Sequence, residues 1–322
     1  MLRVAFVGAL SAGFAESVRA HMAVPCELVV TDEAAVVSLL PELDVLVTLI
    51  FTPAMAAAAK RLRLVQVPGA GLDRIDRAAL PPGAALANVY GHETGIAEYV
   101  LGAMLAMSRG FGRLDAALRV GRWESQWAPG TPPPTWPELA GRTLGILGYG
   151  HIGQALARRA RAFDMEVLAI RRDVPASDPH ATVYQPDRLD DVLGRADYLA
   201  ITLPLTPATR GLIGEGELRR MKARAVLVNV ARAEIVDEAA LYHALAERRI
   251  AGAALDVWYR YPSSADPTFP SRHPFHELPN VLMTPHVSGW TDGMLTARAK
   301  LIAENIGRIA EGEPPANLIA RP

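Results

Sequence analysis

The chain has 322 residues, of which half are hydrophobic and 21% are charged, so we expect two ordinary globular domains and not a disordered chain. Its formal net charge is −1, from 33 basic and 34 acidic residues, which argues against a nucleic-acid-binding or polybasic membrane-surface protein. The single cysteine, Cys26, excludes an intramolecular disulfide framework and a zinc site built on several thiolates.

The N-terminal apolar stretch fits a buried strand better than a secretory signal. We predict a strand over Leu2–Val7, a turn at Gly8 and a helix from Ser11, because Gly8 and Gly13 interrupt the apolar run. No uninterrupted run of 18 apolar residues appears elsewhere, so we expect no membrane span and a cytoplasmic protein.

Short apolar runs then alternate with helical or turn segments through the first hundred residues. The predicted strands cover residues 3–7, 28–30, 45–49 and 64–67, and a predicted helix covers 54–63. This alternation is typical of a parallel sheet that is covered on both faces. A long helical pattern follows over residues 96–118.

The segment 121–141 interrupts the pattern. Its prolines stand at positions 129, 132, 133, 134 and 137 and its tryptophans at 123, 127 and 136. The proline density predicts no regular element there. The tryptophans indicate packing, either against another subunit or as an arm folded over its own domain.

The alternation restarts after Gly141. The predicted strands cover residues 143–147, 166–170, 198–202, 225–229, 253–257 and 281–283. The predicted helices cover residues 152–163, 215–221 and 238–247, and a last helix spans 291–312. Repeated strand–helix units of this kind predict a doubly wound sheet.

A glycine motif follows the first of these strands. Thr143–Leu147 leads into Gly148-Tyr149-Gly150-His151-Ile152-Gly153, and a helix follows. In this context G-x-G-x-x-G is typical of a dinucleotide site. The first glycine permits a tight turn, the second lets a pyrophosphate approach the backbone, and the third lets the helix pack closely. The N-terminal N–H groups of the helix then face the anion.

The end of the next strand carries information about the coenzyme. The sequence there is Ile170-Arg171-Arg172-Asp173, and NAD-specific sites place a carboxylate near this position for the ribose 2′-hydroxyl. Arg171 stands where that carboxylate is expected, and a guanidinium can bind a 2′-phosphate instead. The alternative is that both arginines are solvated and Asp173 binds the hydroxyl. We predict that NADP(H) is preferred, with NAD(H) possible.

Four further stretches carry a family resemblance. They are ADYLAITLPLTPATRGLI at 196–213, VNVARAEIVD at 228–237, GAALDVW at 252–258 and TPHVSG at 284–289. The chain resembles the D-isomer-specific 2-hydroxyacid dehydrogenases, which include glyoxylate/hydroxypyruvate reductases and phosphoglycerate, formate and phosphite dehydrogenases. The resemblance covers nearly the whole chain, is most specific across residues 140–290 and is looser before residue 65.

The resemblance implies a fold and partners. The fold comprises two doubly wound parallel-sheet α/β domains, with a Rossmann cofactor domain inserted into a split, flavodoxin-like substrate domain. The substrate domain would comprise residues 1–101 and 289–322, and the NAD(P)-binding domain residues 102–288. The implied partners are a small 2-keto or 2-hydroxy acid and a second copy of the chain, with no nucleic acid and no membrane.

The resemblance also implies roles for single residues. Arg232 matches the family arginine that binds the substrate carboxylate, and the backbone of Gly69, Ala70 and Gly71 matches the loop that holds the same group. His286 matches the acid/base histidine, whose ordinary pKa near 6.5 suits proton exchange near neutrality. Asp256 would contact the nicotinamide carboxamide. The implied coenzyme contacts are Gly148, Tyr149, Gly150, His151, Ile152, Gly153, Arg171, Arg172, Leu203, Pro204, Thr209, Val230, Ala231, Asp256, His286, Ser288 and Gly289.

One position departs from the family pattern. Most members carry a glutamate five positions after the aspartate that Asp256 matches, and this glutamate pairs with the histidine; here the residue is Tyr261. A carboxylate would raise the pKa of the histidine and fix its tautomer, whereas a phenol orients the ring without supplying charge. Formate dehydrogenases place a neutral glutamine there.

We therefore predict an NAD(P)-dependent oxidoreductase that acts on CH–OH groups, of the glyoxylate/hydroxypyruvate reductase type. Hydride transfer would link nicotinamide and C2 of a small oxyacid, with Arg232, His286 and Tyr261 as the catalytic group. One alternative is a formate- or phosphite-type dehydrogenase. Another is a catalytically weak nucleotide-sensing binding protein, against which the presence of both Arg232 and His286 argues. The remaining histidines form no convincing ligand set, so no metal is predicted.

Overall fold

The computed structural model describes residues 1–128, 130, 135–264 and 266–320. The chain forms two compact units, one of residues 1–92 with the segment from Trp290 onward, the other of residues 93–289. The chain therefore passes from the first unit to the second after His92 and returns to the first unit at Trp290. The predicted boundary at residue 101 falls inside helix α5 (Glu93–Arg109), which lies whole in the second unit. The reason is packing, since Ile96 and Val100 of α5 belong to the core of that unit.

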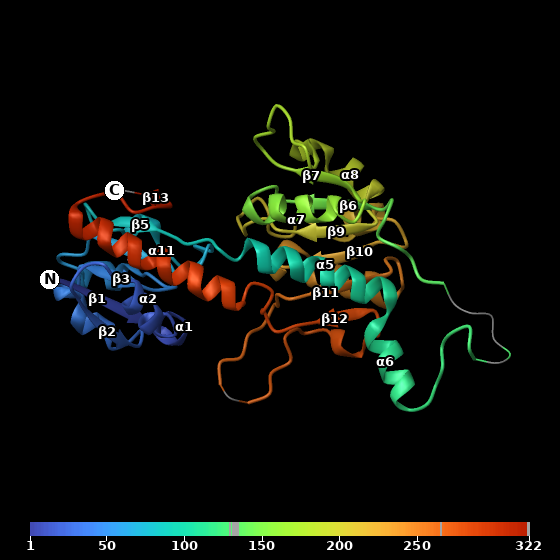
Figure 1. Cartoon of the computed structure of the whole chain (residues 1–322), viewed down its shortest axis with the longest axis horizontal. Helices are drawn as coiled ribbons and strands as arrows, with labels where there is room; N and C mark the ends of the chain where they lie inside the picture. Colours follow the sequence, from blue (N-terminus) through green and yellow to red (C-terminus); the bar gives the residue numbers. More distant parts are fainter. Residues whose placement is uncertain (129, 131–134, 265, 321–322) are drawn as a thin grey trace. The chain divides into compact units, whose positions relative to one another are not determined.

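The first unit contains a six-stranded sheet in the order β13-β5-β4-β3-β1-β2 (Figure 1). Its neighbouring strands are parallel, except that β13 pairs antiparallel with β5. Apart from β13, the order is 2-1-3-4-5, as in flavodoxin-like folds. The strands are β1 (Leu2–Val7), β2 (Cys26–Thr31), β3 (Val45–Val47), β4 (Leu64–Gln66), β5 (Ala85–Ala87) and β13 (Leu318–Ala320). The helices are α1 (Gly8–Ala12), α2 (Ala15–His21), α3 (Val36–Leu39), α4 (Pro53–Ala58) and α11 (Asp292–Glu311).

Both faces of this sheet are buried. Successive side chains of a strand point to opposite faces, so Val4 and Phe6 of β1 pack with α2 and α11, while Ala5 and Val7 pack with α3 and α4. Helices on both faces explain why the strands read as continuous apolar runs and do not alternate.

The second unit contains a seven-stranded parallel sheet in the order β12-β11-β10-β9-β6-β7-β8. Counted from β6, this is the 3-2-1-4-5-6 order of dinucleotide-binding folds with one added strand. The strands are β6 (Thr143–Leu147), β7 (Glu166–Ile170), β8 (Thr182–Tyr184), β9 (Tyr198–Ile201), β10 (Val226–Asn229), β11 (Gly252–Leu255) and β12 (Val281–Met283). Besides α5, the helices are α6 (Phe111–Arg119), α7 (His151–Arg161), α8 (Leu189–Arg195), α9 (Glu215–Arg220) and α10 (Glu238–Ala246).

Helices cover this second sheet on both faces as well. Leu144 and Ile146 of β6 pack with α5 and α7, whereas Leu147 packs with α8, α9 and α10. The predicted fold class of two doubly wound α/β domains is thus confirmed.

The structure differs from the predicted elements in some places. The helix predicted over residues 96–118 is two helices, because Gly110 adopts a φ of 64° between α5 and α6, which breaks the hydrogen-bond ladder. Strands β5, β8 and β13 and helices α3 and α8 were not predicted at all.

In the part of segment 121–141 that the structure describes, no helix or strand forms, as predicted. Trp123 and Trp127 are 59% and 75% exposed, whereas Trp136 is partly buried, so the described residues of this segment do not decide between the two predicted kinds of packing. Prolines 129, 132, 133 and 134 lie outside the described residues.

Candidate active site

The three glycines of the loop between β6 and α7 differ in whether a side chain could fit at their positions. Gly148 has a φ of 104°, and a Cβ on it would lie 2.8 Å from the backbone nitrogen of Leu203. A Cβ on Gly153 would lie 2.5 Å from the carbonyl oxygen of Gly148. A Cβ on Gly150, in contrast, would meet nothing within 4 Å. The first and third glycines therefore serve the fold, and the second faces open space in which a pyrophosphate fits.

The start of α7 suits an anion. Its N-cap residue is Gly150, which has no side chain to accept from the first N–H groups, and its first turn contains no acidic residue. The rest of the loop is fixed, since the N–H groups of Gly148 and Tyr149 both donate to the Ile170 oxygen at 3.1 Å. Thr202 Oγ1 also donates to the Gly148 oxygen at 2.7 Å. The residues present thus fit a phosphate held at the helix N-terminus.

The side chain of Tyr149 is buried and is hydrogen-bonded within the protein. Its hydroxyl donates to Asp178 Oδ1 at 2.8 Å, and the N–H groups of His180 and Ala181 donate to the same oxygen. Burial and the hydrogen bond to Asp178 raise the pKa of Tyr149. These donors lower the pKa of Asp178 against the opposing effect of burial. Only the backbone of Tyr149 is left to face a coenzyme.

Arg171 lies beside this loop, directly after β7. Its N–H donates to the Tyr184 oxygen at 2.9 Å and its Nη1 to the Tyr149 oxygen at 3.4 Å. Arg172 and Asp173 follow it and all three side chains are exposed. The guanidinium of Arg171 is therefore close to the glycine loop and open to solvent, as a contact with a 2′-phosphate requires.

The loop after β9 is held in shape by hydrogen bonds among its own residues. Thr209 Oγ1 donates to the Pro204 oxygen at 2.8 Å and accepts from the N–H of Thr206 at 2.8 Å. Leu203 meanwhile approaches Gly148 through its backbone. Thr209 thus shapes the chain beside the glycine loop.

Arg232 is set in place by a residue that the sequence did not single out. Asn229, at the end of β10, is 1% exposed, donates to the Arg232 oxygen at 3.0 Å and accepts from the N–H of Ala231 at 3.1 Å. Nη1 of Arg232 donates to the Ala231 oxygen at 2.8 Å. Val230 and Ala231 are buried in the same turn. The sequence signal that could have identified Asn229 is its position as the polar last residue of a buried apolar strand.

Asp256 holds the loop that carries His286. Its buried carboxylate accepts from Thr284 Oγ1 at 2.6 Å and from the N–H groups of Val287 and Ser288 at 2.9 and 2.8 Å. Tyr99 of α5 contacts Thr284 Oγ1 at 2.6 Å. Tyr99 was missed by sequence reasoning and gives no sequence signal, whereas Thr284 lies in the TPHVSG stretch but was given no role. The predicted contact between Asp256 and the nicotinamide stays a prediction.

His286 follows β12 in a backbone conformation that is uncommon for residues other than glycine. Its φ is 59°, in the left-handed region, and its N–H donates to the Thr284 oxygen at 3.1 Å. Tyr261 Oη lies 2.7 Å from His286 Nδ1, and the N–H of Trp258 donates to the same Oη at 3.3 Å. The indole N–H of Trp258 donates to the Thr284 oxygen at 2.8 Å. Trp258 thereby fixes both partners of the Tyr261–His286 pair.

The environment of His286 favours the neutral imidazole. The ring keeps a solvent-exposed edge, yet the surrounding protein desolvates it, and this together with the positive charge of Arg232 lowers the pKa of His286. The Asp256 carboxylate opposes the shift without cancelling it. A cation and a proton-exchanging ring therefore interact electrostatically at this site.

The second unit brings most of the predicted residues to one edge of its sheet. Arg232, Asp256 and His286 follow β10, β11 and β12, and the carboxyl ends of parallel strands meet at the same edge, where such folds bind their ligands. Ser288 is buried and Gly289 follows it. Gly69, Ala70 and Gly71 follow β4 in the other unit.

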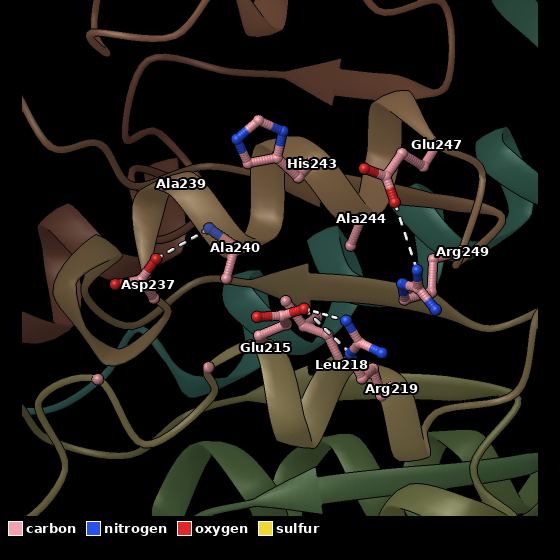
Figure 2. Close-up of a pocket in the computed structure, with 12 residues that line it drawn as sticks. Glu215, Leu218, Arg219, Asp237, Ala239, Ala240, His243, Ala244, Glu247 and Arg249 are labelled. Carbon is pink, nitrogen blue, oxygen red and sulfur yellow. Dashed lines mark hydrogen bonds and ion pairs between the residues drawn. The ribbon is translucent and has the colours of Figure 1, made fainter.

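A pocket of about 670 Å³ lies away from these residues, between α9 and α10 (Figure 2). Figure 2 shows that its charged side chains pair with each other, Glu215 with Arg219 and Glu247 with Arg249, while Asp237 caps α10 by accepting from Ala240. None of the predicted site residues lines it, so its volume does not identify the chemistry.

Two classes of feature are not found in the described ranges. None of their helices is both long and apolar enough to span a membrane. These ranges also contain no group of three or more histidine, cysteine, aspartate or glutamate side chains placed to hold a metal ion.

Comparisons with known proteins agree on one family. The profile of the "D-isomer specific 2-hydroxyacid dehydrogenase, NAD binding domain" matches residues 101–288. A glyoxylate reductase of Korarchaeum cryptofilum is 37% identical over 284 residues, which cover 86% of this chain and 82% of that protein. A hydroxypyruvate reductase of Thermotoga maritima is 35% identical, with 82% and 85% covered. For the D-3-phosphoglycerate dehydrogenase of Methanocaldococcus jannaschii, at 34% identity, the match spans only 48% of the relative's length.

Solved structures show the same relationship. The 2-hydroxyacid dehydrogenase of Ketogulonicigenium vulgare superposes with a TM-score of 0.81 at 28% identity, covering 100% of this chain and 99% of that one. An NADPH-dependent glyoxylate/hydroxypyruvate reductase of Sinorhizobium meliloti, in complex with NADP and sulfate, gives 0.79 at 25% identity, covering 99% and 98%. The chain belongs to the D-isomer-specific 2-hydroxyacid dehydrogenase family of NAD(P)-dependent oxidoreductases, and the names of the family and of these relatives indicate a CH–OH donor.

Proposed function

We propose that the chain is an NADP(H)-preferring reductase of small 2-keto acids, of the glyoxylate/hydroxypyruvate type. One observation carries the proposal: Arg232 and His286 follow strands β10 and β12 at the carboxyl edge of one parallel sheet, where Tyr261 bonds to His286 and Asp256 bonds to the loop that carries it. A fixed cation beside a proton-exchanging ring is what reduction of a keto acid requires. The names of the glyoxylate and hydroxypyruvate reductases that this chain resembles support the same substrate class.

Arg232 would bind the substrate carboxylate. Its planar guanidinium can donate two parallel hydrogen bonds to a carboxylate, and its place after β10 is fixed through Asn229. The backbone amides of Gly69, Ala70 and Gly71 would hold the same carboxylate. A carboxylate bound in this way orients C2 of the keto acid toward the coenzyme.

His286 would deliver the proton. In its charged form the ring donates from Nδ1 to Tyr261 Oη and from Nε2 to the C2 oxygen. When the Nε2 proton has moved to that oxygen, the neutral ring remains bonded to Tyr261. The phenol oxygen accepts the Nδ1–H bond in both states of the ring, because the proton that leaves is the one on Nε2.

The glycine motif, with Arg171 and Arg172, would hold the coenzyme. A bound nicotinamide coenzyme supplies the hydride. The other implied contacts, from Leu203, Pro204 and Thr209 to Val230, Ala231, Asp256, Ser288 and Gly289, belong to this proposal. The exposed guanidinium of Arg171 near the loop supports NADP(H) over NAD(H).

A second candidate is a formate- or phosphite-type dehydrogenase. The observation that favours it is the neutral partner of His286, since Tyr261 supplies no charge to the ring. Such a reaction needs no proton at a C2 oxygen.

We further propose a cytoplasmic homodimer, which the exposed Trp123 and Trp127 support because a partner surface would cover them.

A substrate screen tests the proposal. Purified protein is assayed spectrophotometrically with glyoxylate, hydroxypyruvate, pyruvate, formate and phosphite, each with both nicotinamide coenzymes in the appropriate redox state. We expect reduction of glyoxylate and hydroxypyruvate with NADPH. Activity only with formate or phosphite would establish the second candidate. Binding of a coenzyme without turnover of any of the five would leave a nucleotide-binding protein.

A further inference from the structure

Three consecutive carbonyl groups of the loop after β4 are held by the interior of the first unit. Nη1 of Arg298, on α11, donates to the Pro68 oxygen at 3.1 Å. The N–H of Val89 donates to the Gly69 oxygen at 3.2 Å, and Nδ2 of Asn88 donates to the Ala70 oxygen at 3.1 Å. Asn88 and Val89 follow β5, so the loop is tied both to the neighbouring strand end and to α11.

These three bonds determine where the next three amides point. A trans peptide unit is planar, and its N–H lies on the side opposite to its carbonyl oxygen. There is no cis peptide bond in the described ranges. With the oxygens of Pro68, Gly69 and Ala70 turned inward, the N–H groups of Gly69, Ala70 and Gly71 are turned outward.

The same three amides are left for an external acceptor. Within the part of the chain that the structure describes, no group accepts a hydrogen bond from the N–H of Gly69, Ala70 or Gly71. The loop changes from buried at Pro68 through half-buried to exposed at Gly71, so the amides border solvent. Successive outward amides form a concave set of donors that suits an anion.

Arg298 is itself held rigidly. Its Nη2 lies 2.9 Å from Nδ1 of His92, which is 6% exposed and so is locked in the interior. About two turns further along α11, Asn305 donates to Oε1 of Gln66 on β4 at 2.7 Å, and both side chains are fully buried. Because α11 is bonded to β4 as well as to the loop that follows β4, a change in Arg298 acts on the loop and leaves the helix attached.

We propose that Arg298 and Asn88 are positioning residues for substrate, which orient the amides of Gly69, Ala70 and Gly71 toward the carboxylate of the keto acid. The inference rests on the proposed reductase function. It assigns specificity for an acid over an uncharged carbonyl compound partly to a helix, α11, that supplies no side chain to the chemical step. Arg298 acts only through the Pro68 peptide unit.

Steady-state kinetics of Arg298→Met tests this role. Methionine fills a similar volume but cannot donate to the Pro68 oxygen, so we expect KM for glyoxylate to rise at least about tenfold while KM for NADPH and kcat stay within about threefold. Arg298→Lys keeps one donor and should recover part of the loss. Asn88→Asp, which replaces the donating amide with a carboxylate of the same shape, should raise KM for glyoxylate in the same way. Arg308→Met, on the exposed part of α11 where Arg308 bonds to surface carboxylates, is the matched control and should behave as wild type.

The outcomes separate the inference from the function on which it rests. An active wild type whose KM for glyoxylate is unchanged in Arg298→Met overturns the inference and leaves the reductase in place. Equal losses in kcat and in both KM values, with a lower melting temperature that Arg298→Lys shares, show a merely structural role and also overturn it. A wild type that reduces no keto acid overturns the proposed function, and the inference with it.

Discussion

Tyr261 is the one position at which the family resemblance predicts a different side chain, a glutamate, beside the histidine. Its hydroxyl takes the place beside His286 Nδ1 that a carboxylate takes in most members, so the imidazole gains orientation but no compensating charge. Arg232 adds a positive charge nearby. The pKa of His286, the proton donor of the proposed reduction, is therefore lowered, and the protonated ring is a stronger acid than a free imidazolium.

The pH dependence follows from the direction of this shift. The pKa of His286 is lowered from 6.5 by desolvation and by Arg232. Because keto-acid reduction uses the protonated ring, kcat/KM should be highest at low pH and should fall as pH rises through a value below 6.5. Tyr261→Glu places a negative charge beside the ring, raises its pKa and should move this fall to higher pH. Tyr261→Phe is the control, and an equal upward movement in that variant would contradict the electrostatic explanation.

Arg171 allows a second test at single-residue resolution. Arg171→Asp removes the guanidinium and adds a charge that repels a 2′-phosphate, so Kd for NADPH should rise about 10- to 100-fold, whereas Kd for NADH should stay the same or fall. Arg188→Asp makes the same charge change at an arginine that pairs with Asp191, and should alter neither. Fluorescence titration measures both constants. Tighter binding of NADH than of NADPH by the wild type would contradict the predicted preference.

At the level of elements, the turn between β6 and α7 shows how a short motif carries much of the site. The pattern predicted a strand, a turn and a helix, and the structure has β6 at the predicted bounds and α7 within a residue or two of them. By contrast β5, β8 and β13 were missed, although β3, β4 and β12 also span only three residues and were predicted. Alanine, which is depleted in strands, weakens the signal of β5 and β13.

The three glycines of this turn should respond differently to alanine. Gly153→Ala places a Cβ 2.5 Å from a backbone oxygen that cannot move, so it should destabilise the second unit by about 1–3 kcal/mol or more. Gly150→Ala meets open space and should leave the melting temperature unchanged while it weakens coenzyme binding, because the new methyl group occupies the pyrophosphate's approach. Calorimetry with and without NADPH measures both effects. Unchanged coenzyme affinity in Gly150→Ala would count against the proposed phosphate site.

For the whole molecule, the sequence was sufficient to predict two doubly wound domains, because buried parallel strands and glycine turns are local signals. It was not sufficient for the contacts that fix the catalytic residues. Asn229, Tyr99 and Trp258 hold Arg232 and His286 through hydrogen bonds that include pairings between segments distant in sequence, and such pairings depend on the complete fold. The same holds for Arg298 and Pro68, which are 230 positions apart.

The state of assembly belongs to this scale too. Sedimentation of the full chain should give about twice the chain mass of 34.6 kDa, because Trp123 and Trp127 expose apolar surface that a second copy would cover. The double variant Trp123→Ser, Trp127→Ser should shift the equilibrium toward the monomer. A monomeric wild type at micromolar concentration would contradict the proposed homodimer.

The central claim is that His286 supplies the proton to an oxyacid held by Arg232, and the turnover of His286→Gln tests it most directly. Glutamine keeps a donor of similar reach but cannot exchange a proton near neutrality. The rate of NADPH-dependent glyoxylate reduction should fall at least about a thousandfold, while Kd for NADPH, measured on the same preparation, stays within about twofold of wild type. Turnover near the wild-type rate in this variant, with the coenzyme still bound, would contradict the account.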